Sequence, residues 1–171
     1  MCSLLRVRAD CRSVAIDFLQ TQDRKVVYFY GKAAEPADIG AVVSSLLQQL
    51  VSQMDPLPSS LESIYDDYSI SNARPEPPIM RDLFLEYAKE FPTVYVVLDG
   101  FDDCEDELQR EIVSLVEYFV GASINVLFTS RLPFQCLRFH GRTDSVSTLA
   151  ITAHPDDIRT YNTRHVKRAT S

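Results

Sequence analysis

Three carboxylates follow one apolar stretch of the chain. The segment VYVVLDGFDDCEDE, residues 94–107, runs from apolar and aromatic residues straight into Asp99, and Asp102 and Asp103 follow after only two further residues. A carboxylate at the end of a buried strand is costly unless it faces a cation or accepts hydrogen bonds. In phosphoryl-transfer sites one such acid holds Mg²⁺, and a second orients the attacking water. Asp99 fits the first role and Asp103 the second, with Asp102 as the other choice. The alternative is that Asp99 only turns the chain before the next helix.

A second polar group ends another apolar stretch. The segment INVLFTSR, residues 124–131, finishes in Thr-Ser-Arg. If both stretches are parallel strands of one sheet, Arg131 and Asp99 lie at the same edge, where a guanidinium can meet a terminal phosphate. The alternative is that Arg131 pairs with an acid of the neighbouring loop. The two features together are more specific than either alone.

The elements that must position these groups alternate between strand and helix. Strands are predicted at 25–30, 94–98, 124–129 and 146–151, and helices at 12–21, 37–54, 59–69, 79–91, 105–120 and 155–166. The first three strands are apolar throughout, so each needs cover on both faces. The sequence therefore predicts an α/β three-layer sandwich with a largely parallel sheet flanked by helices. Such sheets bind ligands at the carboxyl ends of their strands.

Helical spacing also predicts which faces are buried. Phe18 and Leu19 are expected on the buried face of helix 12–21, and Ile79 on that of helix 79–91. Gly121 is the expected stop of helix 105–120. Strand 25–30 is expected to be buried on both faces.

Charge and composition exclude several classes of protein. The chain has 171 residues and a formal net charge of −7, which argues against a general nucleic-acid binder. No apolar run approaches the roughly 20 residues that a membrane span needs. The four cysteines form no C-x-x-C pair, and the three histidines lie far apart, so neither zinc ligation nor a disulfide framework is indicated. These features predict a cytoplasmic protein that binds neither nucleic acid nor membrane.

The succession SVAIDFLQ, VVYFY, VVSSLLQQL, VYVVLDGFDDC, NVLFTSR and DDIRTY resembles the NACHT-type STAND NTPase domain, in its nephrocystin-3-like N-terminal form found in fungal receptors. That family's acidic motif is an apolar strand followed by D-A/G-L-D-E-C. The resemblance implies that Asp99 matches the magnesium aspartate and Asp102 the next acid, whereas Asp103 stands where glutamate is usual and would position water. Arg131 matches the arginine of the first sensor motif. Mg²⁺, ATP, and protein partners or self-association are implied as well.

One part of the family pattern is missing. The family opens with a strand and a G-x-x-x-x-G-K-[ST] loop, whose backbone N–H groups cradle the phosphates. Here the first lysine is Lys25 and the first glycine is Gly31, and spacing places Arg8 and Ala9 where Lys and Ser/Thr are expected. Either the chain is truncated or mis-assembled upstream, or the loop has degenerated. Truncation is favoured because the acidic motif is little eroded.

The resemblance divides the chain into three parts. Residues 1–11 are expected to be the degenerate or truncated start, 12–166 a partial NACHT-like nucleotide-binding domain, and 167–171 a tail. The leading expectation is a STAND signalling ATP-binding domain that is not catalytically competent alone. The alternative is a nucleotide-free interaction module, which would offer helices 37–54 and 79–91 and a sheet edge to a partner.

Overall fold

The computed structural model describes residues 12–22, 24–31, 38–61, 64, 66, 68, 75–101 and 104–129. The elements in chain order are α1 (Arg12–Thr21), β1 (Lys25–Tyr30), α2 (Ile39–Val51), α4 (Pro77–Ala88), β2 (Val94–Asp99), α5 (Asp106–Gly121) and β3 (Asn125–Thr129). Between α2 and α4, the described residues 59–61, 64, 66 and 68 are also helical. The predicted order of strands and helices is therefore confirmed from residue 12 to residue 129.

The three strands form one parallel sheet in the order β1-β2-β3. In the register of the sheet, Tyr30 pairs with Asp99, and Asp99 pairs with Thr129. The last residues of all three strands therefore lie side by side at the carboxyl edge. β2 is the central strand, and its apolar residues are buried because each face of the sheet is covered by helices.

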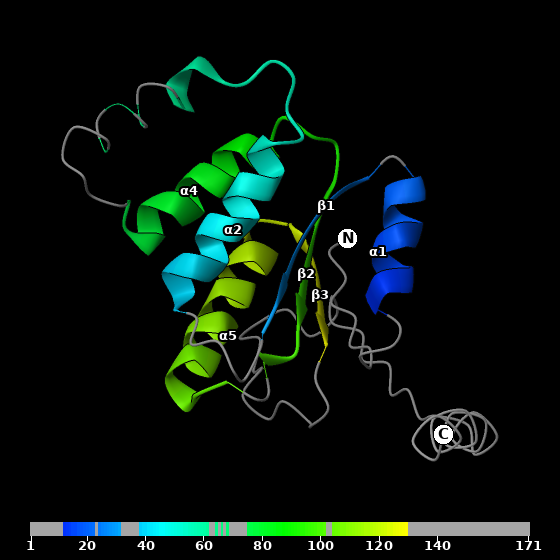
Figure 1. Ribbon diagram of the computed structural model, residues 1–171, viewed down its shortest axis with the longest axis vertical. Coiled ribbons are helices and arrows are strands. Elements are labelled where there is room, and N and C mark those ends of the chain that lie inside the picture. Colours follow the sequence, from blue (N-terminus) through cyan, green and yellow to red (C-terminus); the bar gives the residue numbers. More distant parts are fainter. Residues whose placement is uncertain are drawn as a thin grey trace, which may run out of the picture.

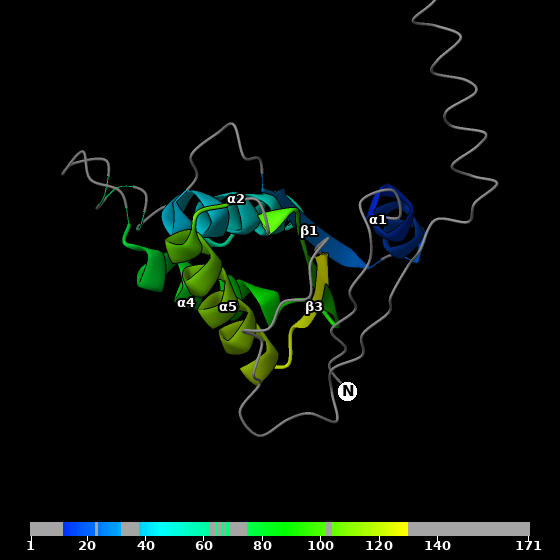
Figure 2. The ribbon, with the colours of Figure 1, turned by 90° about the horizontal axis from the view of Figure 1, so that it is seen from below.

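Helices lie on both faces of the sheet (Figures 1 and 2). The larger core lies on the face covered by α2, α4 and α5, and it includes Val27, Val96, Leu98 and Phe128. A smaller cluster on the α1 face joins Ile16 to one residue from each strand, namely Val26, Val97 and Leu127. The predicted α/β sandwich with a parallel sheet between helical layers is confirmed. Within the described part of the chain, no helix is long and apolar enough to cross a membrane.

The outer edge of β1 is occupied by one side chain of α2 and one from the turn that follows it. The side-chain amide of Gln49 accepts a hydrogen bond from the backbone N–H of Tyr28 at 3.0 Å and donates one to its carbonyl at 2.8 Å. The side chain of Gln53 donates to the carbonyl of Val26 at 3.2 Å. Gln49 thus bonds to Tyr28 as a neighbouring strand would, which protects this edge from pairing with another chain.

This edge arrangement predicts a local change on mutation. We expect Gln49→Leu to speed hydrogen exchange at the Tyr28 amide, because the N–H of Tyr28 loses the acceptor that protects it. Sedimentation velocity is expected to show more self-association of this variant. Gln48→Leu is the matched control, since Gln48 lies one position away on the same helix and is exposed. Equal Tyr28 exchange rates in the two variants would contradict this role for Gln49.

Three expected details are wrong. Phe18 is 60% exposed, because α1 packs on the sheet through Ile16 and Leu19, and Phe18 points about 200° away from Ile16 around the helix. Ile79 is 41% exposed, because α4 packs through Met80, Phe84, Tyr87 and Ala88, and Ile79 lies about 100° from Met80 around the helix. β1 is not buried on both faces, because Tyr28 is 36% exposed at the sheet edge.

The end of α5 also differs from its prediction. Gly121 is the last helical residue rather than the stop, and Ala122 caps the helix. Ser123, two residues after the end of the helix, adopts the left-handed conformation with φ 66°. Glycine is the usual residue in that conformation after a helix. The predicted strand at 146–151, the helix at 155–166, and the segments 1–11 and 167–171 lie outside the described residues.

Candidate functional site at the carboxyl edge of the sheet

Asp99 is the last residue of the central strand and is buried, with 2% of its surface exposed. The hydroxyl of Thr129, itself 1% exposed at the end of β3, donates a hydrogen bond to the Asp99 carboxylate. Among the buried core residues of the described part, these two are the polar ones. The sheet therefore brings one acid and one hydroxyl together at the edge where parallel sheets bind ligands.

The Asp99 side chain lies on the α1 face of the sheet. Side chains two residues apart on a strand share a face. Val97 and Leu127, two residues before Asp99 and Thr129, belong to the cluster that packs on Ile16 of α1. The acid–hydroxyl pair therefore shares a face with α1, the helix that precedes the first strand of this sheet.

Two glycines fix the backbone around Asp99. The N–H of Gly31 donates to the carbonyl of Asp99 at 2.7 Å, which continues the β1–β2 ladder by one residue. Gly100 has φ 77°, and a Cβ there would lie 2.9 Å from the carbonyl oxygen of Gly31. A Cβ on Gly31 would likewise lie 2.9 Å from the Gly100 oxygen. The chain can leave β2 at this point only because both residues lack a side chain.

Phe101 anchors the turn that Gly100 begins. Its ring is fully buried on the face opposite the Asp99 side chain, with centroids 5.8 Å from Phe29 and 6.4 Å from Phe128. Gly100 lies between Asp99 and Phe101, whose side chains lie on opposite faces of the sheet. The Asp99 carboxylate lies on the α1 face, and the Phe101 ring lies in the core of the other face. This arrangement holds the carboxylate at the edge.

The site accounts for part of the ligand set that a magnesium–nucleotide needs. A carboxylate oxygen suits Mg²⁺, which commonly takes one or two carboxylates and completes its shell with water and substrate phosphates. Within the described residues, no group of three or more His, Cys, Asp or Glu could hold a metal ion by itself. Asp102, Asp103 and Arg131 lie outside the described residues, so the structure does not place them beside Asp99. The Asp99–Thr129 pair fits the metal side of such a site, and the sequence holds no glycine-rich loop for the phosphates.

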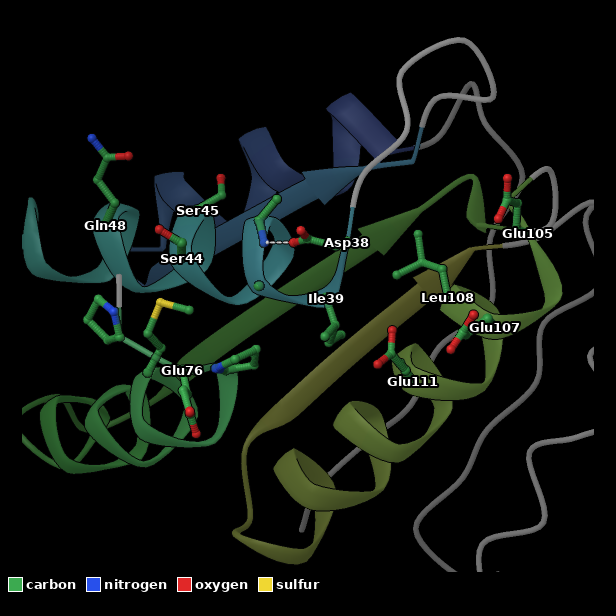
Figure 3. A pocket seen from close by; sticks show the side chains of 15 residues that line it. Asp38, Ile39, Ser44, Ser45, Gln48, Glu76, Glu105, Glu107, Leu108 and Glu111 are labelled. Atoms are coloured by element: carbon green, nitrogen blue, oxygen red, sulfur yellow. Dashed lines mark hydrogen bonds between the residues drawn. The ribbon is translucent and has the colours of Figure 1, made fainter. Parts of the chain in front are cut away.

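A separate cleft of about 1080 Å³ opens where α2, α4 and α5 begin (Figure 3). It is lined by the side chains of five acids, together with apolar residues that include Ile39, Met80 and Leu108; the acids are Asp38, Glu76, Glu105, Glu107 and Glu111. The described lining contains no lysine or arginine. Because like charges repel, this cleft does not suit phosphates. It lies among the helices of the sheet face opposite the Asp99 side chain.

Sequence reasoning missed three parts of this site. In the segment ending Thr-Ser-Arg, the pattern singles out Arg131 and not Thr129. Between the predicted acids, Gly100 and Phe101 carry no polar side chain and so attract no prediction. A polar residue that ends an apolar strand is the signal that could have singled out Thr129, since a buried hydroxyl needs a hydrogen-bond partner.

Comparison with known proteins agrees with this geometry. Among solved structures, the fold is similar to a chain in the structure of Drosophila ORC bound to AT-rich DNA and Cdc6, with TM-score 0.54 and 12% identity over 87% of this chain and 48% of that one. It is also similar to the Walker-type ATPase of Pyrococcus abyssi, with TM-score 0.50 and 12% identity over 99% of this chain and 53% of that one. The chain thus spans about half the length of either structure. No curated protein matches the sequence.

The family comparison is more specific than the structural one. The model of the nephrocystin 3 N-terminal domain matches residues 11–131, which include the strand that carries Asp99 and the strand that carries Thr129. At 12% identity the two solved structures establish the fold alone. Because this family model matches more than half of the sequence, the chain belongs to the nephrocystin 3 N-terminal family.

Proposed function

We propose that this chain is a nucleotide-binding signalling domain of the NACHT-like STAND class that retains the magnesium side of its site and cannot hydrolyse ATP on its own. The observation that carries the proposal is the buried Asp99 at the carboxyl end of the central strand, held by the hydroxyl of Thr129. Membership of the nephrocystin 3 N-terminal family and the P-loop ATPase fold support it.

In this proposal each predicted residue has a separate role. Asp99 binds Mg²⁺ through its carboxylate, and Asp102 and Arg131 contact the nucleotide phosphates. Asp103 orients water, although its carboxylate reaches one methylene less far than the usual glutamate. Mg²⁺ would supply neutralisation of the phosphate charge. The backbone of Gly31, Gly100 and Phe101 fixes where the Asp99 carboxylate lies.

The missing phosphate cradle determines the expected activity. Phosphoryl transfer depends on positioning and electrostatic stabilisation more than on covalent chemistry. Removing a single preorganised donor from an active site typically lowers kcat by about 10²–10³-fold. The sequence contains no G-x-x-x-x-G-K-[ST] loop. It therefore lacks the several backbone N–H donors and the lysine that such a loop supplies to the phosphates. We therefore expect weak nucleotide binding and negligible hydrolysis.

The test is isothermal titration of Mg-ATP into the purified chain, together with a steady-state ATPase assay. We expect little heat at micromolar protein and no turnover above background. Asp99→Ala is measured in parallel, and Glu107→Ala, which removes an exposed acid of the cleft, is the matched control. Micromolar binding that Asp99→Ala abolishes and Glu107→Ala leaves intact would overturn the proposed incompetence. Turnover above background with the same dependence on Asp99 would overturn it as well.

The alternative proposal of a nucleotide-free interaction module needs a surface that is buried in this fold. It requires the apolar stripes of α2 and α4 to face a partner. In the fold those stripes are buried, with Val42, Leu46 and Phe84 each showing no exposed surface. Of the two edges of the described sheet, that of β1 is already bonded by Gln49. Protein partners or self-association, as the family resemblance implies, would have to use other surfaces.

A further inference from the structure

Thr129 is an unusual residue for its position. It follows the apolar run Val126, Leu127 and Phe128 on a strand whose last four residues are all buried. Valine has nearly the same shape, is favoured in strands, and would avoid the cost of burying a hydroxyl. A hydroxyl at this position therefore indicates a specific hydrogen-bond partner rather than simple core packing.

That partner is the Asp99 carboxylate. The register of the sheet pairs the two residues directly, and the Thr129 hydroxyl donates to Oδ1 of Asp99. Thr129 is β-branched, so its side-chain rotation is restricted and the position of its Oγ is set by the strand. The pair thus links the ends of β2 and β3 through the acid.

We propose that Thr129 is the positioning residue of the metal-binding carboxylate, an inference that rests on the proposed role of Asp99 in binding Mg²⁺. Its hydroxyl bond fixes the rotation of the buried Asp99 carboxylate. The direction in which the carboxylate meets a divalent cation is then set by β3 as well as by β2. Outer-shell partners of metal ligands that act in this way typically contribute about 10–100-fold to metal affinity.

The test measures cation affinity, with Mn²⁺ as the probe in place of Mg²⁺. Free Mn²⁺ is followed by electron paramagnetic resonance during titration of the full chain, without nucleotide. Thr129→Val removes the hydroxyl and keeps the shape, whereas Thr129→Ser keeps the hydroxyl. Asp99→Asn removes the charge, and Glu107→Gln removes an acid of the cleft and controls for non-specific binding. Amide spectra of each variant establish that it is folded.

The expected result is a loss of affinity of about tenfold or more in Thr129→Val and retention in Thr129→Ser. Asp99→Asn is expected to lose the site, and Glu107→Gln to keep it. If Asp99→Asn loses the site while Thr129→Val keeps the original affinity, the metal role of Asp99 stands and the positioning role of Thr129 is wrong. If Asp99→Asn binds as the unaltered chain does, the proposed metal role itself is wrong. If Thr129→Ser binds Mn²⁺ as weakly as Thr129→Val does, the shape of the side chain and not its hydroxyl determines the affinity. That result also overturns the inference.

Discussion

Replacing Phe101 by alanine is expected to lower the free energy of unfolding by about 3–5 kcal/mol, the range for removing a large buried aromatic side chain. The ring has no exposed surface and lies between Phe29 and Phe128, which come from the two outer strands. Its removal leaves a cavity that these rigid strands cannot easily fill. Urea unfolding followed by circular dichroism measures the change.

Phe18→Ala is the matched control for this prediction. Phe18 is 60% exposed on α1, so its truncation is expected to change stability by about 0.5 kcal/mol or less. If the two variants unfold at the same urea concentration, Phe101 does not anchor the turn after β2. The same anchor holds Asp99 at the sheet edge, so Phe101→Ala is also expected to weaken any cation binding that depends on Asp99.

Replacing Gly100 by alanine is the second change with a large expected effect. With φ 77°, an alanine at this position is strained by about 1–3 kcal/mol. The added Cβ would also lie 2.9 Å from the carbonyl oxygen of Gly31, a backbone atom that cannot move aside without shifting β1. Such overpacking typically costs a further 1–3 kcal/mol or so. We therefore expect a total loss of about 2–6 kcal/mol by urea unfolding.

Gly121→Ala provides the comparison for Gly100→Ala. Gly121 is the last helical residue of α5, and nothing lies within 4 Å of the Cβ that alanine would add. Alanine favours the helix by up to about 1 kcal/mol over glycine, so this variant is expected to be neutral or slightly more stable. A Gly100→Ala variant as stable as Gly121→Ala would mean that the two glycines do not pack as described.

The sequence was sufficient to predict the order of the elements and the place of Asp99. Fully apolar strands and long amphipathic helices have few other arrangements, because each strand must be covered on both faces. The same logic placed Asp99 at the carboxyl edge, and the pairing of Asp99 with Thr129 confirms that the two apolar stretches end together.

The sequence pattern does not predict which side chains are buried or bonded where that depends on a neighbouring element. The helical period of α1 allows either Phe18 or Ile16 to face inward, and only the position of the sheet decides between them. Likewise, nothing in the local sequence shows that Gln49 bonds to Tyr28, 21 residues away. The close backbone contact between Gly31 and Gly100 forms only where the ends of β1 and β2 lie side by side. Neither glycine alone therefore predicts that contact from the sequence.

The site was predicted in part for a similar physical reason. An acid directly after an apolar stretch is visible in the sequence, which is why Asp99 could be singled out. The partner that satisfies the acid comes from another strand, and the sequence alone does not give the register that pairs Thr129 with Asp99. Asp102, Asp103 and Arg131 stay predictions, since they lie outside the described residues.

The central claim is that a cation binds at the ends of β2 and β3, and locating Mn²⁺ by paramagnetic broadening of amide signals tests it most directly. Signals of Asp99, Gly100 and Thr129 are expected to broaden first. The effect is expected to fade along the strands toward Val94 and Asn125, about 13–17 Å away at roughly 3.3 Å per residue. Broadening centred on Glu105 and Glu107 in the acidic cleft, with the strand ends unaffected, would contradict it.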